Sequence, residues 1–322
     1  MSLPAGAHFA RRLFFREARV STITQTNGRL SSTTRAERIH SFEDRYRQQQ
    51  FTRRNWTLLY GALFLAALIG SVAVSDFSIP GLLKGLPMAW NYIAGTLPSL
   101  SVENFWADLA DWYWGLRFWT RLLVETILMG FVGTVLGGAV ALLLSFPASR
   151  NLVENTGIYF IARRTLEFFR TVPELVFALI FVFAFGLGPF AGVLAIAVHT
   201  AGSLGKLFAE VNENVDPRPI EGVRASGGNW PMIMRLGVVP QALPNYASYL
   251  LLRFEINVRG ASALGLVGAG GIGEDLYVAI RQFEYTDISA IMLLLILTTS
   301  VIDISCESIR HRLIGHNLTQ SA

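Results

Sequence analysis

The sequence predicts an all-α, polytopic membrane protein with about six transmembrane helices. Of its 322 residues, 52% are hydrophobic and only 16% are charged, whereas about a quarter of the residues of soluble domains are charged. The apolar residues gather in separate runs, and several of these approach the roughly 20 residues needed to cross the hydrocarbon core of a bilayer. Together these features predict one membrane domain preceded by an arm outside the membrane.

The N-terminal arm, residues 1–55, is strongly basic and poor in apolar positions. It holds eleven arginines against four acidic residues. A basic arm can bind nucleic acid, but an arm directly before a hydrophobic span more often follows the positive-inside rule. We therefore predict no nucleic-acid partner and a cytoplasmic arm, partly disordered or lying on the membrane surface. The first apolar run also begins too late for an ordinary cleavable signal peptide.

Residues 56–123 combine a first span with a segment that we expect on the outer face. The span covers 56–74 and follows Arg53 and Arg54, which anchor its start in the cytoplasm. The segment after it contains prolines that are expected to break any helix, namely Pro80, Pro87 and Pro98. Aromatic rings also gather there, at a density that suits the headgroup level: Trp106, Trp112, Tyr113, Trp114 and Trp119.

Residues 124–312 are predicted to form the transmembrane core, and 313–322 a tail. Its spans are expected at 125–146, 172–185, 189–207, 242–266 and 289–304. The first of these spans contains Gly133 and Gly137, a small-xxx-small pair that allows a neighbouring helix to approach closely.

The connections between the spans differ in composition, and this sets the predicted topology. The polar segments 147–170 and 208–240 are expected in the cytoplasm, and a tight turn is expected at 186–189. The Gly-rich and acidic segment 267–288 is expected to be an outer loop. Six crossings return the chain to the side on which it began, so both termini are predicted to be cytoplasmic.

The chain contains no recognisable catalytic or metal-binding constellation. Its single cysteine, Cys306, excludes an intramolecular disulfide, and its five histidines are scattered. A packed, hydrogen-bonded imidazole is the favoured interpretation of His199, with a pathway-facing one as the alternative. Segment 202–207 is similar to a P-loop, but Thr200 stands at the position of the first glycine and Leu207 replaces the Mg²⁺-binding hydroxyl. The sequence therefore predicts neither an enzyme nor an ATP site in this chain.

A Gly-rich turn follows the fifth span, and it matches the dinucleotide-binding pattern G-x-G-x-x-G only by letter. Its glycines are Gly268, Gly270, Gly271 and Gly273. A dinucleotide site needs a strand before the motif and an acidic residue about 20 positions later, whereas here a membrane helix precedes it. The favoured role is backbone freedom for a sharp turn and close helix approach.

The fifth span is unusual because polar side chains occupy its central part. These are Arg253, Glu255, Asn257 and Arg259. Inserting three ionisable groups costs about 8–10 kcal/mol, and the surrounding apolar residues return only about 2–4 kcal/mol. Glu255 can pair with Arg259, and Arg253 and Asn257 share the same i, i+4 spacing. The span itself carries net +1. Two interpretations stay open: a buried network that joins helices, or a polar lining for an anionic solute.

A short cytoplasmic segment near 217–231 is predicted to be an amphipathic helix between two spans. It contains Glu221, Gly222, Val223, Arg224, Ala225, Ser226 and Gly227. The segment fits an ordinary surface helix, and it also fits a helix that docks on a cytoplasmic partner.

This segment resembles the Glu-Ala-Ala motif of ABC importer permeases. Glu221 is followed six residues later by Gly227 and then by Pro240, as in that motif. The sequence departs from the motif where Gly222 and Val223 replace two alanines. Two further departures lie near its end: Gly237 stands at the usual isoleucine position, and Val239 replaces leucine.

The surrounding residues are more specifically similar to phosphonate-type permeases. The similarity lies in 199–221, in 253–259 and in 264–273, within a stretch of about 120–312. The resemblance implies the type I ABC importer permease fold, with 221–227 as the coupling helix and the polar residues of 253–259 as candidates for the translocation pathway. Methionine-type permeases share the arginine and Gly-rich ending, so this element does not identify the solute.

The resemblance also implies a mechanism and a set of partners. It implies a multi-pass protein of the bacterial inner membrane, paired with a second permease copy, a cytoplasmic ABC ATPase dimer and a periplasmic solute-binding protein. ATP and Mg²⁺ are expected on the ATPase, and no cofactor on this chain. The expected solutes are phosphonates or reduced-phosphorus oxyanions such as phosphite and hypophosphite. The alternatives are a methionine or amino-acid permease and, from other classes, a membrane-embedded enzyme or an ion channel.

Overall fold

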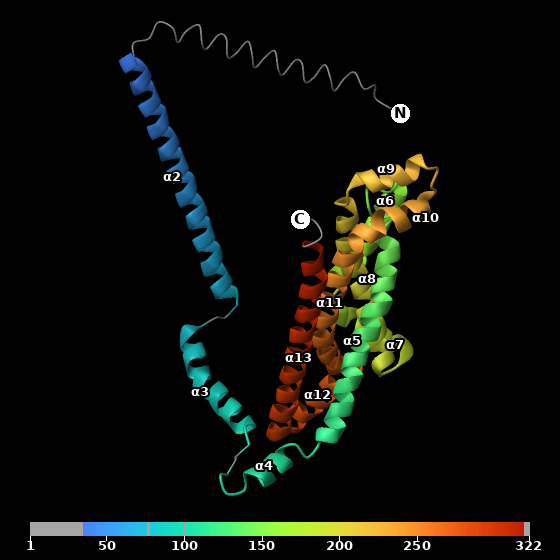
Figure 1. Cartoon of the computed structure of the whole chain (residues 1–322). Helices are drawn as coiled ribbons and strands as arrows, with labels where there is room; N and C mark the ends of the chain where they lie inside the picture. Colours follow the sequence, from blue (N-terminus) through green and yellow to red (C-terminus); the bar gives the residue numbers. More distant parts are fainter. Residues whose placement is uncertain (1–34, 76–77, 99–100, 319–322) are drawn as a thin grey trace. The chain divides into compact units, whose positions relative to one another are not determined.

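A computed structural model describes residues 35–75, 78–98 and 101–318, which are almost entirely helical and contain no strand (Figure 1). In chain order the elements are α2 (Arg35–Val74), α3 (Ile79–Thr96), α4 (Phe105–Trp112), α5 (Leu116–Ser145), α6 (Thr156–Thr171), α7 (Glu174–Phe185), α8 (Pro189–Glu213), α9 (Pro217–Ala225), α10 (Trp230–Met232), a π-helix (Ile233–Val238), α11 (Val239–Leu264), a 3₁₀ helix (Gly265–Val267), α12 (Ile272–Gln282) and α13 (Tyr285–Leu318). The predicted all-α class is confirmed. Much of the predicted arm, 1–34, and the end of the predicted tail, 319–322, lie outside the described residues.

The chain divides into two compact units, residues 1–87 and 88–322. The first unit holds α2, which is 40 residues long and begins well before the predicted span. Its apolar part, Gln49–Val74, is long and apolar enough to cross a membrane, in agreement with the predicted first span.

Helix α3 corrects the expectation that three prolines would break any helix in this segment. Pro80 lies in its first turn, where the backbone N–H has no partner to lose, and Pro98 follows its end. Pro87 lies inside the helix, which nevertheless continues to Thr96. The helix is not apolar enough to qualify as a membrane span, so the segment does not cross by length and composition.

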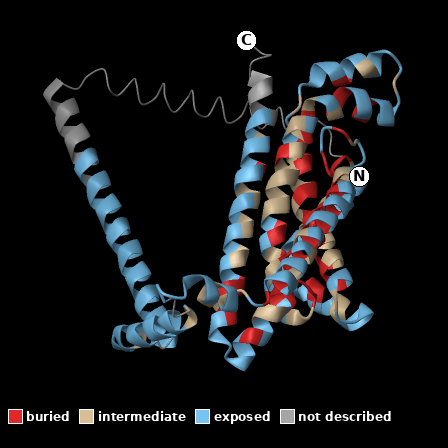
Figure 2. Ribbon diagram, turned by 60° about the horizontal axis from the view of Figure 1, so that its bottom comes forward, coloured by how far each residue is buried: buried red, intermediate tan, exposed pale blue. Residues whose placement is uncertain are grey.

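The core of the second unit is built around the packed pair α5 and α8, which α11 joins. A Cβ at Gly133 would collide with Ile196 of α8, and one at Gly137 would collide with the backbone oxygen of Ala197. The predicted close approach at these two glycines is therefore confirmed. Buried residues lie along the facing sides of the helices, whereas the outer faces are exposed and largely apolar (Figure 2).

The predicted third span, 172–185, is shorter and more sharply bent than expected. Helix α7 has only 12 residues, and it meets α6 at an angle of 88°. Pro173 explains the break because a residue before proline is driven into the extended region, where Val172 lies with φ −72° and ψ 125°. The predicted cytoplasmic loop 147–170 therefore contains a helix, α6.

The predicted outer loop 267–288 is also largely helical. Helix α12 occupies its middle, packs against α13 and lies at 48° to the Trp230–Val267 segment. Among the described residues, four helices are long and apolar enough to cross a membrane, and the count reaches six if each bent pair is one span. The predicted number of crossings is the upper end of this range.

Three tryptophans of the aromatic cluster form hydrogen bonds with residues of α12 and α13. Trp119 lies inside α5, is 2% exposed, and donates a hydrogen bond from Nε1 to Asp275 of α12 at 2.7 Å. Trp114 donates to Asp287 at 3.1 Å, and Trp112 donates to Ser289. These bonds connect α5 to α12, and they connect the segment before α5 to the start of α13. Trp106 and Trp114, in contrast to Trp119, are 79% and 71% exposed.

The carboxylate of Asp108, in the first turn of α4, binds a residue that lies just before this helix. The backbone N–H and the hydroxyl of Ser101 both donate to Asp108, at 2.7 and 2.6 Å. These two hydrogen bonds stabilise the charged carboxylate and lower the pKa of Asp108 below its usual value.

Candidate functional site

The predicted docking segment forms α9, a short helix with one packed face and one exposed face. The side chain of Asp216 caps its start by accepting a hydrogen bond from the backbone N–H of Arg218 at 3.0 Å. Ile220 is buried and Val223 is partly buried, so these two residues hold the helix against the protein. The other residues singled out in the sequence are exposed: Glu221, Gly222, Arg224, Ala225, Ser226 and Gly227.

The end of α9 and the element after it explain two glycines of this region. Gly227 has φ +80°, a left-handed conformation that favours glycine and ends the helix. The π-helix that follows packs against α9, and a Cβ at Gly237 would lie 3.2 Å from the Cα of Ile220. The departure from the family motif at Gly237 therefore permits close packing of the two elements.

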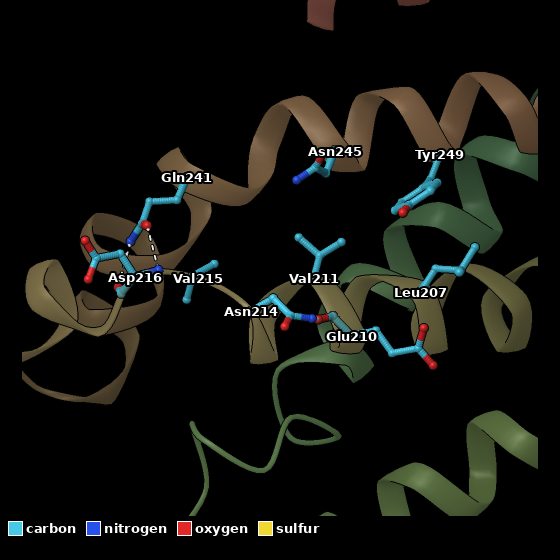
Figure 3. A pocket seen from close by; sticks show the side chains of 9 residues that line it. All are labelled: Leu207, Glu210, Val211, Asn214, Val215, Asp216, Gln241, Asn245 and Tyr249. Atoms are coloured by element: carbon cyan, nitrogen blue, oxygen red, sulfur yellow. Dashed lines mark hydrogen bonds between the residues drawn. The ribbon is translucent and has the colours of Figure 1, made fainter. Parts of the chain in front are cut away.

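A polar clamp joins the start of α9 to the start of α11 beside a surface pocket (Figure 3). The backbone N–H of Asp216 donates to Gln241 Oε1 at 3.0 Å, and Gln241 Nε2 donates to the backbone oxygen of Asp216 at 3.2 Å. Gln241 Nε2 also donates to Gly237 O at 2.6 Å. Sequence reasoning missed Gln241, because nothing in its local pattern distinguishes it from an ordinary polar residue. The clamp provides a direct connection between the exposed helix α9 and the polar span α11.

The pocket has a volume of about 440 Å³ and lies between the end of α8 and the first half of α11. Its lining combines apolar side chains with carboxylates, amides and a phenol, and the side chains shown in Figure 3 converge on it from both helices. The lining residues are Leu207, Glu210, Val211, Asn214, Val215, Asp216, Gln241, Asn245 and Tyr249.

The polar residues of the fifth span separate into two networks on opposite sides of α11. Arg253 and Asn257 form the first network together with α5 and α8. Asn257 is buried, and its Nδ2 donates to both Thr134 Oγ1 and Thr200 Oγ1 at 2.8 Å. Arg253 Nε donates to the same Thr200 hydroxyl at 3.4 Å. Arg253 and Asn257 thus meet at a shared threonine rather than at each other.

Glu255 and Arg259 form the second network, together with Asp303 of α13. The predicted pairing of Glu255 with Arg259 is present as a short hydrogen-bonded ion pair. Arg259 also lies 3.6 Å from Asp303. The side chain of Arg259 is 50% exposed, whereas that of Glu255 is 14% exposed. The separation from the first network follows from helix geometry, because residues two apart lie on nearly opposite faces.

Two carboxylates that the sequence did not single out change the charge of this region. Glu174 of α7 interacts electrostatically with Arg253, and Asp303 faces Arg259. These two carboxylates offset the +1 counted within the fifth span. The charge counted within the span alone therefore does not describe its surroundings, because periodicity within one span does not reveal which residues of other helices face it.

Glu174 lies where the chain bends between α6 and α7. It is the first residue of α7, where the helix dipole favours a negative charge. Its Oε1 is inaccessible and has no hydrogen-bond partner. Nearby, His199 Nδ1 lies 3.1 Å from the backbone oxygen of Val172 and is positioned to donate to it. This geometry matches the predicted packed imidazole. The one signal that could have identified Glu174 is a carboxylate at the start of a strongly apolar run.

The Gly-rich turn packs two parts of the core together. Gly268, Gly270 and Gly271 have φ values of +77°, +82° and +79°, which glycine adopts at little cost. The backbone N–H of Gly188 donates to Gly268 O at 3.0 Å, which joins the α7–α8 turn to this one. Gly273 approaches α11 so closely that a Cβ would overlap Ser262 O. The turn follows a 3₁₀ helix, and no strand precedes it, so the backbone role is the one that the structure supports.

The fold and the site together define an integral membrane protein with a polar interior and a short, largely exposed helix, α9, between two of its spans. The chain belongs to the family described as binding-protein-dependent transport system inner membrane component, whose sequence model matches residues 134–314. Membership makes the chain a transporter permease subunit of the inner membrane, and it implies an ATPase and a solute-binding protein as partners.

Individual relatives agree with this assignment. The phosphite transport system permease protein PtxC of Stutzerimonas stutzeri is 36% identical over 222 residues, which are 69% of this chain and 76% of the relative. The putative phosphite transport system permease protein HtxC of the same organism is 32% identical over 259 residues, 80% of this chain and 87% of the relative. An inward-facing structure of the MetNI methionine ABC transporter matches with a TM-score of 0.53 at 21% identity, covering 62% of this chain and 97% of that chain. This last similarity establishes the type I importer permease fold.

Proposed function

We propose that this chain is the permease subunit of an ABC importer for phosphonates or related reduced-phosphorus oxyanions such as phosphite and hypophosphite. The observation that carries the proposal is the identity of 36% and 32% to two permeases named for phosphite transport, each over more than two thirds of this chain. A methionine-type permease is the alternative, supported by fold similarity at 21% identity.

We infer that α9 is the coupling helix, with Glu221 to Gly227 as the residues that meet the ATPase. Exposure of this face and attachment of its opposite face through Ile220 support this role. The Gln241 clamp gives α9 a rigid connection to α11, so a force applied to α9 reaches the polar span directly.

The proposed assembly has two permeases, two ATPase subunits that bind ATP and Mg²⁺, and one periplasmic binding protein. We take the second permease to be another copy of this chain, with both termini in the cytoplasm. Arg253, Glu255, Asn257 and Arg259 are the proposed residues of the translocation pathway or of the network that shapes it. Contact between charged side chains and lipid is unfavourable. The half-exposed side chain of Arg259 is therefore consistent with contact to a second subunit or to an aqueous passage.

Reconstituted transport tests the substrate class. The complete importer in proteoliposomes, with the binding protein encoded beside this chain, is supplied with ATP and with phosphite, methylphosphonate or methionine. We expect uptake of the phosphorus oxyanions and none of methionine. Methionine uptake, or tight methionine binding by the binding protein, would contradict the proposal.

Substitution in α9 tests the coupling role separately. Glu221→Ala removes an exposed carboxylate without disturbing the packed residues, and we expect ATP hydrolysis to lose its stimulation by solute-loaded binding protein while the complex stays assembled. Glu307→Ala, which removes an exposed carboxylate of α13 outside the proposed site, is the matched control. Normal stimulated hydrolysis and uptake in the Glu221→Ala complex would refute the coupling role.

A further inference from the structure

Glu174 and Arg253 are oppositely charged neighbours in the membrane region that do not form a salt bridge. They interact electrostatically, but among the ion pairs of the described residues none within 4.0 Å joins them. Glu174 Oε1 has no hydrogen-bond partner and is inaccessible to solvent. Arg253 donates only one recorded hydrogen bond, a long one of 3.4 Å to Thr200. Each group therefore retains unused hydrogen-bonding capacity next to the other.

The second network of α11 contains an arginine that carboxylates contact directly. Arg259 is paired with Glu255 and lies 3.6 Å from Asp303. Of the two arginines in this span, Arg253 is thus the one that no carboxylate neutralises by direct contact. An anionic group that reaches Arg253 does not have to displace an existing salt bridge.

Arg253, Asn257 and Gly260 share one face of α11, because they are spaced four and seven residues apart. Glu174 lies over this face: its carboxylate oxygens are 3.5 and 3.7 Å from the position that a Cβ would take on Gly260. Ile256, beside them on α11, is 42% exposed. The cluster is therefore at the margin of the single chain, where lipid is an unfavourable neighbour for charged groups.

The chemistry of the cluster requires a particular kind of ligand. Arg253 offers N–H donors and a positive charge, whereas the Glu174 carboxylate only accepts hydrogen bonds. The other titratable or charged groups facing this space are His199 of α8 and Arg170 at the end of α6. A ligand that satisfies both sides must carry an anionic oxygen for Arg253 and an acidic hydroxyl for Glu174.

We propose that Glu174 and Arg253 form a selectivity site for singly protonated oxyanions, in which Arg253 binds the charged oxygen and Glu174 accepts the hydrogen bond of the acidic hydroxyl. This inference rests on the proposed function and narrows it, because a singly protonated phosphonate carries both groups near neutral pH, whereas the hypophosphite anion has no hydroxyl to donate. Sulfate is fully deprotonated at that pH, so it has no hydrogen to donate and places negative charge against an unpaired carboxylate. The site thus selects by protonation state rather than by charge alone.

Binding to the permease–ATPase complex in nanodiscs, without the binding protein, tests this site by equilibrium dialysis. The probes are radiolabelled methylphosphonate and radiolabelled sulfate. For the wild type we expect at least about tenfold tighter binding of methylphosphonate, since an unpaired buried charge is costly. In Glu174→Gln the amide can donate to either anion, and we expect the preference to fall to about twofold or less. Glu167→Gln, the same change at a partly exposed carboxylate of α6 that pairs with Arg164 and not with this cluster, should keep the wild-type ratio.

The pH dependence gives a second readout that a merely structural role would not change. As pH rises through the second ionisation of methylphosphonate, its affinity for the wild type should fall about tenfold, whereas its affinity for Glu174→Gln should change little. Glu174→Asp, which keeps the carboxylate, should keep the wild-type dependence and also guards against a variant that fails to fold.

The outcomes separate this inference from the function on which it rests. An unchanged ratio and pH profile in a monodisperse Glu174→Gln complex would overturn the inference. So would the absence of methylphosphonate binding by a wild-type complex that transports it with its binding protein. If that complete importer transports methionine and no phosphorus oxyanion, the proposed function itself is wrong.

Discussion

Helices α9 and α11 both carry the residues that matter for function, but they hold them in opposite ways. In α9 only Ile220 is buried, and the residues from Glu221 to Gly227 are exposed or partly exposed. In α11 the polar side chains are bonded to α5, α8 and α13. The difference teaches that a change in α9 should alter contact with a partner, whereas a change in α11 should first alter the stability of the bundle.

Of the substitutions that test this contrast, Asn257→Leu is expected to cause the largest loss of stability. The change removes two hydrogen bonds that connect α11 to Thr134 and Thr200. It leaves the Thr134 hydroxyl without this donor and the Thr200 hydroxyl with only the long bond from Arg253. We expect a loss of about 2 kcal/mol in stability, measured as a lower midpoint of thermal unfolding in detergent. An unchanged midpoint would show that α11 is not held by this network.

A smaller loss is expected for Gly237→Ile, which introduces the residue usual in the family motif. Its Cβ would lie 3.2 Å from the Cα of Ile220, so α9 has to shift away from the π-helix. Overpacking of this kind costs about 1–2 kcal/mol, and thermal unfolding measures it. A variant as stable as the wild type would show that α9 can shift away from the π-helix without a loss of stability. The attachment of α9 would then differ even more from that of α11.

The second network of α11 should contribute less than the first. Arg259 is half exposed, so solvent weakens its interaction with Glu255, and a pair of this kind is worth about 0.5 kcal/mol. A double-mutant cycle with Arg259→Gln and Glu255→Gln measures this coupling energy in the isolated chain. A coupling above about 2 kcal/mol would mean that the pair is effectively buried, and the two sides of α11 would then be alike.

An effect of similar size but opposite sign is expected in α9 itself, for Gly222→Ala. No atom lies within 4 Å of the added Cβ, and alanine is favoured over glycine inside a helix by about 0.5–1 kcal/mol. We expect a slightly higher midpoint of thermal unfolding for the isolated permease. A lower midpoint would indicate a packed partner for this face within the chain and would break the contrast.

The sequence was sufficient for the features that depend on local pattern. Hydropathy predicted the helical membrane class, the small-residue spacing of Gly133 and Gly137 predicted close packing, and the i, i+4 spacing predicted the pairing of Glu255 with Arg259. The short amphipathic helix was also predicted, and the structure shows that Ile220 is buried on its packed face.

The features that the sequence did not reveal depend on contacts between distant segments. The two carboxylates that offset the positive charge of α11, Glu174 and Asp303, lie on other helices. Helix α12 was predicted to be a loop because its region is rich in glycines and acidic residues. The helix is stabilised by packing on α13, which the local sequence does not reveal. The interior position of Trp119 follows from its bond to Asp275, more than 150 residues away.

The short helix α7 has a consequence for the surrounding bilayer. Its 12 residues span only about 18 Å, whereas the hydrocarbon core is about 30 Å thick. Bulky apolar side chains at its end, Phe183 and Phe185, are 89% and 60% exposed. A hydrophobic mismatch of about 12 Å on this side has to be relieved by local thinning of the membrane or by another polypeptide. Transport rates should therefore depend on the acyl-chain length of the host lipid.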